Sequence, residues 1–469
     1  MSSERFLRYR LLTEAVGRSA ERWHYYNNQI AALLAPLIPN DASVVQFGSG
    51  NGNLLTMLPG KNKTGIEMNV ELLTRAKAVH PELAWIEDDF WNLNHDAHFD
   101  YAVMSEITDT LDDVEVVLRQ ARRLISSDGR LIIAARSVLW RPFSRLSHFL
   151  APRTARAAFP SLLSQRDLTN LLYLAGFEVI KVGRGVPVPI RIPIISSFFN
   201  RVIPGLPLLS YLGIIQYVVA RPLPEKRADC SVSIVIAARN EQGNIEKLLE
   251  SIPSFSSRQE IVFVEGNSSD GTWEEIQRVA HLSTPERKII AIQQDGKGKW
   301  DAVEKGFAVA TGDLLMILDA DMTVLPQDLP RFYTAFLEGR GEFINGSRLM
   351  YPMDHKAMRF LNKLGNLFFA TLISTIVRRK LTDTLCGTKV LRKSDWFRIK
   401  ALRNLFELHD PFGDFELVFG AAWLNLRIVD LPVRYREREY GATQINRFSD
   451  GWLLLRLCGN AWRHFRFPR

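Results

Sequence analysis

The chain contains two openings of the kind that nucleotide-binding α/β domains use, one in each half. In the first half, the apolar residues 44–47 run directly into a glycine-rich turn, Gly48-Ser49-Gly50-Asn51-Gly52. In the second half, residues 233–236 run into a polar turn at 237–241, and Asp319-Ala320-Asp321 follows a later apolar run. A strand that ends in such a turn presents backbone N–H groups to a ligand at the edge of a parallel sheet. Two openings therefore indicate two nucleotide-type sites, and two chemistries, on one polypeptide.

Length and composition are those of a multidomain globular protein. A chain of 469 residues is long enough for two or three domains at ~100–200 residues each. Its three cysteines, Cys230, Cys386 and Cys458, are far apart, which argues against a disulfide framework and suits a reducing compartment. The first ten residues are charged and lack the apolar core of a secretion signal. We therefore expect a cytoplasmic protein.

The basic charge is compatible with more than one partner. The net charge is +8 and the pI is about 9.3. Anionic lipid surfaces and phosphorylated substrates both explain this sign, and a solvated basic surface explains it equally well. Lysine and arginine are spread along the chain without a basic-aromatic binding module. We therefore expect no nucleic-acid partner.

The first half alternates short apolar runs with helical patterns. Strands are expected at residues 44–47, 63–67, 83–89, 99–104, 131–135, 177–180 and 215–219, and helices over about 70–80 and 114–125. Ser127-Asp128-Gly129 is expected to stop the second helix. This alternation predicts an α/β fold with a doubly wound parallel sheet.

A charged segment with prolines separates this half from the second. Residues 221–227 hold two prolines and four charges between apolar runs, which is the composition of a linker. The alternation then restarts, with apolar strands expected at 261–264, 288–292 and 314–318. We predict a first doubly wound α/β domain over residues 1–222, a linker over 223–230 and a second over 231–469.

Three apolar or aromatic segments raise the question of membrane contact. Residues 202–220 are nearly long enough to span a bilayer, but Pro204, Gly205 and Pro207 interrupt them, and a buried strand with an apolar lead-in is the preferred interpretation. Residues 364–377 are followed by three cations at 378–380, which fits either a core helix or an interfacial one. The C-terminal run 452–469 mixes tryptophan and phenylalanine with arginine. The last two segments favour peripheral binding to an anionic membrane, and two amphipathic helices that close a core are the alternative.

The first glycine-rich turn has an acid at the spacing that ribose binding requires. Glu67 lies about 20 residues beyond the turn and closes the next expected strand. The glycines are spaced G-x-G-x-G, unlike the G-x-G-x-x-G of dinucleotide folds. A tight turn without a ligand is the alternative for so short a motif.

With its neighbours, this region resembles the S-adenosylmethionine-dependent methyltransferases of the Rossmann-like class. The resemblance runs from about residue 20 to 220 and rests on VVQFGSGNG from Val44, GIEMN from Gly65, EDDF from Glu87, FDYAVMSEITDTLDD from Phe99 and GRLIIAAR from Gly129. It implies that the cofactor is S-adenosylmethionine, with these residues at its site: Gly48, Gly50 and Gly52 against the methionine part, Glu67 on the ribose, and Asp89 and Phe90 beside the adenine. Gln46 stands where the family usually has an acid. No base is identified among His98, Asp109 and His148, and a non-catalytic scaffold domain is the alternative.

The second half carries two carboxylates one residue apart at the end of an apolar strand. Asp319 and Asp321 are placed to hold a hard divalent cation while leaving positions for substrate phosphates. An EF-hand is excluded, because its sixth and twelfth positions would be Val324 and Pro330 rather than Gly and Glu. A solvated turn is the alternative for a lone D-x-D.

The surroundings of this motif resemble glycosyltransferase family 2, inverting enzymes with the GT-A fold. The matching segments are SIVIAARNEQGNI from Ser233, NSSDGT from Asn267, GKGKWDAVEKGFAVATGD from Gly296, NGSRL from Asn345, DTLCGTKVLRKSDW from Asp383 and GDFELVFGAAWLNLRIVDLPVRYREREYGAT from Gly413. The set is most similar to dolichyl-phosphate and polyprenyl-phosphate sugar transferases.

This second resemblance implies a role for each matching residue. Asp319 and Asp321 would bind Mg²⁺ or Mn²⁺, and Asp414 would act as a base or orient the acceptor. The nucleotide-sugar pocket would be formed by Ala238, Asn240, Glu241, Glu265, Asp270, Gly296, Lys297 and Gly298. Arg348 and Arg438 are suited to phosphate contacts, because a guanidinium pairs with phosphate oxygens bidentately. The chain departs from the family pattern at Gly266 and at Gln444, where an acid and a lysine are usual.

The sequence thus predicts a bifunctional enzyme, a methyltransferase fused to an inverting glycosyltransferase. It would transfer a sugar from a nucleotide-sugar to a polyprenyl-phosphate or glycan acceptor in the assembly of a lipid-linked or cell-surface glycan, with peripheral contact to the cytoplasmic face of the membrane. The alternative is a transferase that acts on a sugar or protein hydroxyl, with Asp414 as a true base and a first domain that only binds cofactor or serves as a scaffold.

Overall fold

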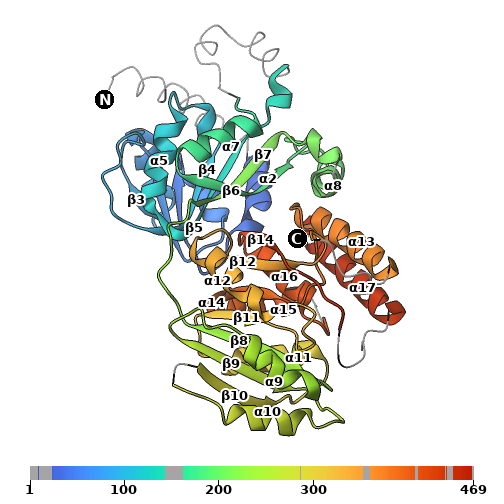
Figure 1. Ribbon diagram of the computed structural model, residues 1–469. Coiled ribbons are helices and arrows are strands. Elements are labelled where there is room, and N and C mark those ends of the chain that lie inside the picture. Colours follow the sequence, from blue (N-terminus) through green and yellow to red (C-terminus); the bar gives the residue numbers. More distant parts are fainter. Residues whose placement is uncertain are drawn as a thin grey trace. The chain divides into compact units, whose positions relative to one another are not determined.

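The computed structural model describes Tyr9 and residues 24–142, 162–206, 208–285, 287–351, 360–406, 410–438, 440 and 447–466. Side chains are described within these ranges except for residues 360, 405–406 and 447–449. The chain divides into two compact units between Leu223 and Pro224, with the last four residues assigned to the first unit. Both units are α/β (Figure 1).

The first unit is built on a seven-stranded sheet in the order β3-β2-β1-β4-β5-β7-β6. Its strands are β1 (Ser43–Phe47), β2 (Asn62–Ile66), β3 (Ala84–Ile86), β4 (Phe99–Ser105), β5 (Ile125–Arg136), β6 (Phe177–Gly185) and β7 (Ile215–Pro222). Strands β1 to β5 are parallel, whereas β7 is antiparallel to both of its neighbours. The doubly wound prediction is confirmed, with β7 as one reversed strand inside the sheet.

Helices cover both faces of this sheet. They are α2 (His24–Leu34), α3 (Asn53–Met57), α4 (Val70–Val79), α5 (Val114–Leu124), α7 (Gln165–Leu174) and α8 (Ile195–Val202), with short 3₁₀ turns η1 (Ala35–Leu37), η2 (Ile107–Asp109), η3 (Val138–Trp140), η5 (Ile203–Gly205) and η6 (Leu209–Leu212). Helices α5 and α7 share one apolar core with β1 side chains Val45 and Phe47. Helices α2 and α3 share the other core with Val44. This alternation along β1 is the period of two that a strand between two helical layers requires.

Polar caps start three of these helices. Asn69 accepts hydrogen bonds from the backbone of the first turn of α4, Asp113 does so for α5, and Ser164 with Asp167 forms a capping box for α7. The expected stop at residues 127–129 is wrong. Helix α5 ends at Leu124, and β5 begins at Ile125 with a register irregularity against β4.

The second unit is built on another seven-stranded sheet, in the order β10-β9-β8-β11-β13-β12-β14. Its strands are β8 (Val232–Ala238), β9 (Gln259–Glu265), β10 (Arg287–Gln293), β11 (Leu314–Ile317), β12 (Phe343–Ser347), β13 (Lys389–Arg392) and β14 (Ile428–Pro432). Strand β13 is antiparallel to β11 and β12, and the other pairs are parallel. The carboxyl ends of β8, β9, β10 and β11 therefore lie along one edge.

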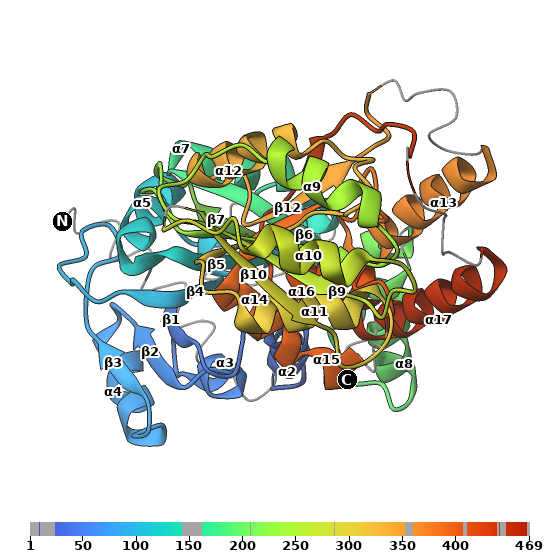
Figure 2. The same cartoon turned by 60° about the horizontal axis from the view of Figure 1, so that its bottom comes forward.

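The helices of this unit also form two layers (Figures 1 and 2). They are α9 (Gln242–Ser251), α10 (Thr272–Ala280), α11 (Lys299–Val309), α12 (Leu329–Leu337), α13 (Phe360–Val377), α14 (Lys393–Ala401), α15 (Arg403–Phe406), α16 (Asp414–Trp423) and α17 (Arg447–Arg466), with the 3₁₀ turn η7 (Pro326–Asp328). Helices α9, α10 and α12 share one apolar core with the sheet. Helices α11, α13, α14, α16 and α17 share the other.

The segments that raised the membrane question fold as a strand preceded by turns and as parts of the helices α13 and α17. In residues 202–220 only the last part is a strand, since β7 begins at Ile215 after the turns η5 and η6. Helix α13 buries Phe369, Ile373 and Ile376 in the core. Within the described ranges, no helix combines the length and the apolar character needed to cross a bilayer.

Candidate functional site

The expected sugar-transfer residues gather at the carboxyl ends of β8, β9 and β11. Strand β8 pairs with β9 on one side and with β11 on the other. The strands that follow β8 in sequence are therefore added first on one side of it and then on the other, so the strand order reverses at β8. In an open α/β sheet, ligands bind at such a switch point. Ala238 ends β8, Glu265 ends β9, and Asp319 and Asp321 follow β11.

Asp319 is paired with a lysine that the sequence analysis did not single out. The ammonium of Lys299, the first residue of α11, binds the Asp319 Oδ1 atom. Burial raises the pKa of Asp319, but the charges of Lys299, Lys389 and Arg348 and the hydrogen bond from Lys299 outweigh this and hold it below its usual range. Burial opposes the charge on Lys299 too, and Asp319 and Asp414 outweigh it, so the pKa of Lys299 lies above its usual range. Both groups are therefore charged at neutral pH.

Asp321 is paired with Arg438. One guanidinium nitrogen of Arg438 binds Asp321 Oδ2, and another lies 3.3 Å from Glu241 Oε1. Asp321 also accepts hydrogen bonds from the backbone and side chain of Thr323, at 3.1 and 2.8 Å. Arg438 thus joins the D-x-D turn to the turn after β8, although 117 residues separate it from Asp321.

Glu241 is the group of this cluster that titrates near neutral pH. Burial raises the pKa of Glu241 to about 7, against the lowering effects of its hydrogen bond from Asn244 and of the Arg438 charge. The Asn244 amide lies 2.6 Å from Glu241 Oε2. A carboxyl group with this environment beside two other acids is a common feature of functional sites.

The loops after β8 and β9 are tied to each other. Asn240 Oδ1 accepts from the Ser269 N–H at 2.8 Å, and the Asn240 N–H donates to Ser268 Oγ at 3.0 Å. Asp270 accepts from the Thr272 N–H at 3.1 Å. Glu265, which is buried, binds the Ser268 N–H and the Gln293 amide. Asn240, Glu265 and Asp270 therefore lie together, and the Asn240 and Glu265 oxygens already accept hydrogen bonds from neighbouring segments of the same unit.

In the segment Gly296-Lys297-Gly298-Lys299, the second lysine is the one that contacts the candidate site. Gly298 has φ +91° and starts α11, while Lys297 is exposed. Gly387 lies so close to the Asp319–Lys299 pair that a Cβ atom there would collide with both side chains. The second lysine in Gly-Lys-Gly-Lys was the only sequence signal for Lys299.

Asp414 also has a lysine partner. It begins α16 and is buried, with Oδ1 2.5 Å from the ammonium of Lys389, which is fully buried. Asp410 accepts from the N–H groups of Phe415 and Glu416 in the first turn of the same helix, at 2.8 and 3.3 Å. Asp414 raises the pKa of Lys299 by its charge, so it belongs to the same cluster as the D-x-D acids.

Arg348, expected as a phosphate contact, is paired with Asp383 in this structure. Its guanidinium binds both oxygens of the fully buried Asp383, at 2.8 and 3.0 Å. Asp383 also accepts from the Asn366 amide of α13 at 2.8 Å. Burial raises the pKa of Asp383, but Arg348 more than offsets this and brings it below its usual range. Asp383 therefore joins the loop before β13 to Asn366 of α13 and to Arg348.

The two D-x-D carboxylates can bind a divalent cation if substrate phosphates supply further ligands. Among the described residues no group of three or more His, Cys, Asp or Glu side chains is arranged to hold a metal ion. Mg²⁺ is usually bound by one or two carboxylates together with substrate phosphates. Asp319 and Asp321 supply that number, and the cations now on them show that both carboxylates attract positive charge.

In the first unit, the glycine-rich turn and Glu67 form one site. Gly48, Gly50 and Gly52 have φ values of +61°, +55° and +83°, and a Cβ at Gly48 would collide with Ile107. The Glu67 carboxylate is fully buried and accepts from the N–H groups of Gly50 and Asn69, both at 2.9 Å. Burial raises the pKa of Glu67 above its usual value, and these hydrogen bonds limit the rise.

Tyr9 contacts both Glu67 and Phe90, and its presence at this site was not predicted from the sequence. Its hydroxyl lies 3.1 and 3.3 Å from the two Glu67 oxygens. Its ring meets Phe90 edge to face at 5.5 Å. Phe90 is fully buried and also contacts Phe47, whereas Asp89 is partly exposed and accepts from the Trp91 N–H at 3.0 Å. Tyr9 therefore occupies the place beside Glu67 and Phe90 where the resemblance puts adenosine.

A second ionisable cluster lies at the carboxyl ends of β4 and β5. Arg136 binds Asp109 Oδ2 at 2.8 Å and lies 3.6 Å from Glu106. Tyr26 donates to Glu106 at 2.9 Å. Burial raises the pKa of Asp109 to about 6 despite Arg136. Of the three base candidates, Asp109 is buried, His98 is exposed, and His148 lies outside the described residues.

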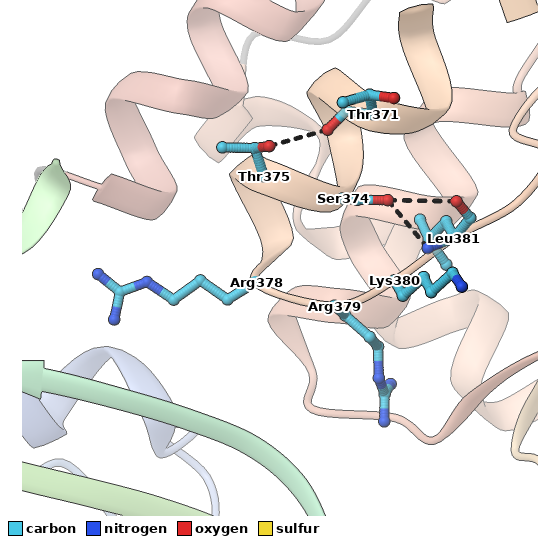
Figure 3. A pocket seen from close by; sticks show the side chains of 7 residues that line it. All are labelled: Thr371, Ser374, Thr375, Arg378, Arg379, Lys380 and Leu381. Atoms are coloured by element: carbon cyan, nitrogen blue, oxygen red, sulfur yellow. Dashed lines mark hydrogen bonds between the residues drawn. The ribbon is translucent and has the colours of Figure 1, made fainter. Parts of the chain in front are cut away.

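A surface pocket of about 460 Å³ lies in the second unit, at the end of α13, and none of the candidate site acids lines it. It is lined by Thr371, Ser374, Thr375, Arg378, Arg379, Lys380 and Leu381 (Figure 3). The three cationic side chains point in different directions in this view. They form a basic rim rather than a cradle for one phosphate.

Comparison with known proteins assigns each unit to a class. Residues 233–398 match the model of glycosyl transferase family 2, and residues 21–182 match the model of a methyltransferase domain. The chain is 28% identical over 217 residues to an undecaprenyl-phosphate 4-deoxy-4-formamido-L-arabinose transferase of Edwardsiella ictaluri (strain 93-146), which covers 45% of this chain and 62% of that protein. It thus spans about three fifths of that relative.

Two archaeal proteins are similar over stretches of 167 and 225 residues. A dolichol-phosphate mannosyltransferase of Pyrococcus furiosus is 34% identical over 167 residues, 34% of this chain and 46% of that protein. A dolichyl-phosphate hexose transferase of Haloferax volcanii is 26% identical over 225 residues, 47% of this chain and 89% of that protein. The chain thus contains one segment similar to methyltransferase domains, residues 21–182, and one segment similar to glycosyl transferase family 2, residues 233–398.

Proposed function

We propose that the second unit transfers a sugar from a nucleotide-sugar to a polyprenyl phosphate, with inversion at the anomeric carbon. The observation that carries this proposal is the set of charges at the carboxyl edge of β8 and β11. Asp319 and Asp321 lie beside Lys299 and Arg438, and the same edge holds the turns expected to bind the nucleotide. Acids that can bind a cation and cations that can bind phosphate are the two needs of a leaving nucleoside diphosphate.

The chain's own residues would divide this work. Asp319 and Asp321 would hold Mg²⁺ or Mn²⁺, which acts as a Lewis acid on the diphosphate. Lys299 and Arg438 would turn from these acids to the phosphate oxygens once the donor is present, because a guanidinium or ammonium binds phosphate strongly. The turns at Asn240 and Asp270 would surround the nucleoside.

The environment of Asp414 favours a phosphate acceptor over a hydroxyl. Lys389 holds one oxygen of Asp414 at 2.5 Å, an arrangement that suits orientation better than removal of a proton. A phosphate oxygen is already ionised at neutral pH and needs no base, whereas a sugar or protein hydroxyl does. The same acceptor class is supported by the relatives from Edwardsiella, Pyrococcus and Haloferax, because each of their names includes a lipid phosphate.

A lipid acceptor calls for contact with a membrane, and α13 and α17 supply suitable surfaces. Helix α13 exposes Leu361, Leu364, Leu367 and Phe368 and leads into the basic rim at residues 378–380 (Figure 3). Helix α17 exposes Trp452 at 73%. Apolar side chains followed by cations match the order of layers at an anionic bilayer surface.

For the first unit we propose S-adenosylmethionine-dependent methyl transfer, with Glu67 on the ribose and Asp109 as the base. The glycine-rich turn, the buried Glu67 carboxylate and the ionisable cluster around Asp109 lie at the carboxyl ends of β1, β2 and β4. One observation favours the scaffold alternative, because Tyr9 occupies the Glu67 carboxylate.

A donor and acceptor screen tests the transferase. UDP- and GDP-sugars are incubated with the full chain, Mn²⁺ and undecaprenyl phosphate, and the lipid fraction is analysed by mass spectrometry. The expected product is a lipid phosphate that carries one sugar, and EDTA should abolish it. Asp313→Asn is the matched control for Asp321→Asn, because Asp313 lies before the opposite end of the same strand. Transfer only to soluble glycans or peptides would replace the lipid acceptor by the hydroxyl alternative.

A further inference from the structure

The first unit exposes a large apolar surface between β6 and β7. The excursion from Val186 to Ile214 contains α8 and the turns η5 and η6. Its side chains include nine large apolar residues that are at least 40% exposed: Ile190, Ile194, Ile195, Phe198, Phe199, Leu208, Leu209, Tyr211 and Leu212. Ile194 and Leu208 are exposed at 86% and 85%. So dense a group of exposed apolar side chains on one short segment indicates an interaction surface.

The charge of this segment has one sign. Residues 179–224 contain no Asp or Glu, while Lys181, Arg184, Arg191 and Arg201 fall among the apolar residues. Arg191 and Arg201 are exposed. The Arg184 guanidinium lies 4.1 Å above the Tyr211 ring. A partner must therefore offer apolar material and negative charge together.

Hydrogen bonds hold this apolar surface in shape. Ser196 Oγ binds both the carbonyl and the N–H of Ile192, at 2.8 and 3.1 Å. Asn200 binds the N–H and the carbonyl of Val188, both at 2.8 Å, and its amide donates to Tyr25 at 3.1 Å. Ile194, which projects furthest, has φ +66°, a conformation that is costly for a β-branched residue. The fold therefore holds Ile194 in an unfavourable backbone conformation with its side chain exposed.

We propose that residues 186–214 form a membrane-binding surface of the first unit. The apolar side chains of this surface insert into the interfacial region of an anionic bilayer, between the headgroups and the acyl chains. Side chains of α8, η6 and Ile190 enter the acyl boundary, and the arginines contact lipid phosphates. Mixed apolar and cationic character without a single acid is the pattern of interfacial segments. This surface belongs to the unit that carries Glu67, and it does not rest on the acceptor proposed for the second unit.

An environment-sensitive label tests the surface directly. Leu208→Cys in a Cys230→Ser background is labelled with a nitrobenzoxadiazole dye in the full chain, since Cys386 and Cys458 are buried. Val79→Cys, at a position of α4 that is 65% exposed, is the matched control. With vesicles of equal phosphatidylglycerol and phosphatidylcholine, the emission at position 208 should shift to the blue and that at 79 should not. High salt should reverse the shift.

A second pair of variants measures the contribution to binding. Phe198→Ser with Leu208→Ser should lower partition into the same vesicles about tenfold or more, because two large apolar side chains are lost. Val79→Ser with Tyr173→Ser removes comparable exposed apolar side chains elsewhere in the unit and should leave partition unchanged. Circular dichroism and the Tm confirm that each variant is folded.

Three results would overturn the proposal. A label at 208 that stays in water while the chain binds vesicles would leave membrane contact to the second unit alone. A blue shift that depends on protein concentration without vesicles would assign the surface to a second copy of the chain. A shift that an acidic protein partner produces and vesicles do not would assign it to a protein interface.

Discussion

The replacement of Glu67 by Gln gives the sharpest test of the cofactor site. In the native structure its two oxygens accept from the N–H groups of Gly50 and Asn69 and from the Tyr9 hydroxyl. Gln keeps the shape but turns one oxygen into an NH₂ group, which cannot accept. One backbone N–H is then left without its partner in a site where Glu67 is 0% exposed. The ribose hydroxyls would also lose a charged acceptor.

The size of the effect follows from this count. A hydrogen bond to a charged group contributes about 1.5–3 kcal/mol, so the affinity for S-adenosylhomocysteine should fall by roughly 10- to 150-fold. The unsatisfied N–H should lower the free energy of unfolding by about 1–3 kcal/mol. Both changes are expected in Glu67→Gln, whereas Glu82→Gln, at a side chain that is 60% exposed, should show neither.

Titration calorimetry with S-adenosylhomocysteine measures the affinity, and urea unfolding measures the stability. Tyr9→Phe sharpens the test because it removes one donor and keeps the ring on Phe90. If Tyr9 competes with the ribose for Glu67, this variant should bind the cofactor more tightly while Glu67→Gln binds it less tightly. A folded Glu67→Gln variant with native affinity would refute the ribose assignment, and a folded native chain that gives no heat would establish the scaffold alternative.

Four further outcomes are expected. Asp321→Asn should lower sugar transfer by ~10²-fold or more, as loss of a group that acts in the transition state does, with S-adenosylhomocysteine affinity unchanged; transfer that persists in EDTA would contradict the metal role. Lys299→Met should raise the affinity of the nucleotide-free chain for Mn²⁺, followed by electron paramagnetic resonance, because Asp319 loses its own cation; an unchanged affinity would show that the lysine does not compete. Burial raises the pKa of Glu241 from its ordinary 4.5 to about 7, so between these values the folded state holds a proton that the unfolded chain releases, and this group's contribution to stability falls as pH rises; urea unfolding of Glu241→Gln should show a weaker decline than the native chain from pH 5 to 7, and equal slopes would contradict the assignment. A fragment that starts at residue 224 should be more stable to heat than one that starts at 231, because Arg227 binds the Leu337 and Phe336 carbonyls; equal Tm values would show that these contacts contribute nothing.

Strands β1 to β11 were predictable from sequence because most are built around apolar residues, whereas β12, β13 and β14 were not predicted. Strands β1, β8, β9 and β11 lie between helical layers, and their side chains cannot face water. The start of β5 was not predictable. Residues 126–129 carry serine, aspartate and glycine, which local preference assigns to a helix end, and they instead form the irregular stretch of β5 between the residues Ile125 and Arg130 that pair with β4.

The acids of the sites were predictable from their place after a strand, and their cationic partners were not. Each pair joins side chains that are distant in sequence: 20 residues for Lys299 and Asp319, 25 for Lys389 and Asp414, and 117 for Arg438 and Asp321. Such pairs depend on which strands become neighbours. For the same reason, the partner of Arg348 could only be found once the loop before β13 was placed beside β12.

Strand β7 has a consequence for the order in which the chain is made. It is the last strand of the first unit to leave the ribosome, yet it lies inside the sheet between β5 and β6 and pairs with both. Until Pro222 has been synthesised, β6 has no partner, and the edge of β5 is bare. The first unit therefore reaches its native sheet only when the start of the second unit is already being translated. A nascent chain that stops after β6 and before β7, between residues 185 and 215, exposes the unpaired edges of β5 and β6, which makes this window the point of greatest risk of aggregation.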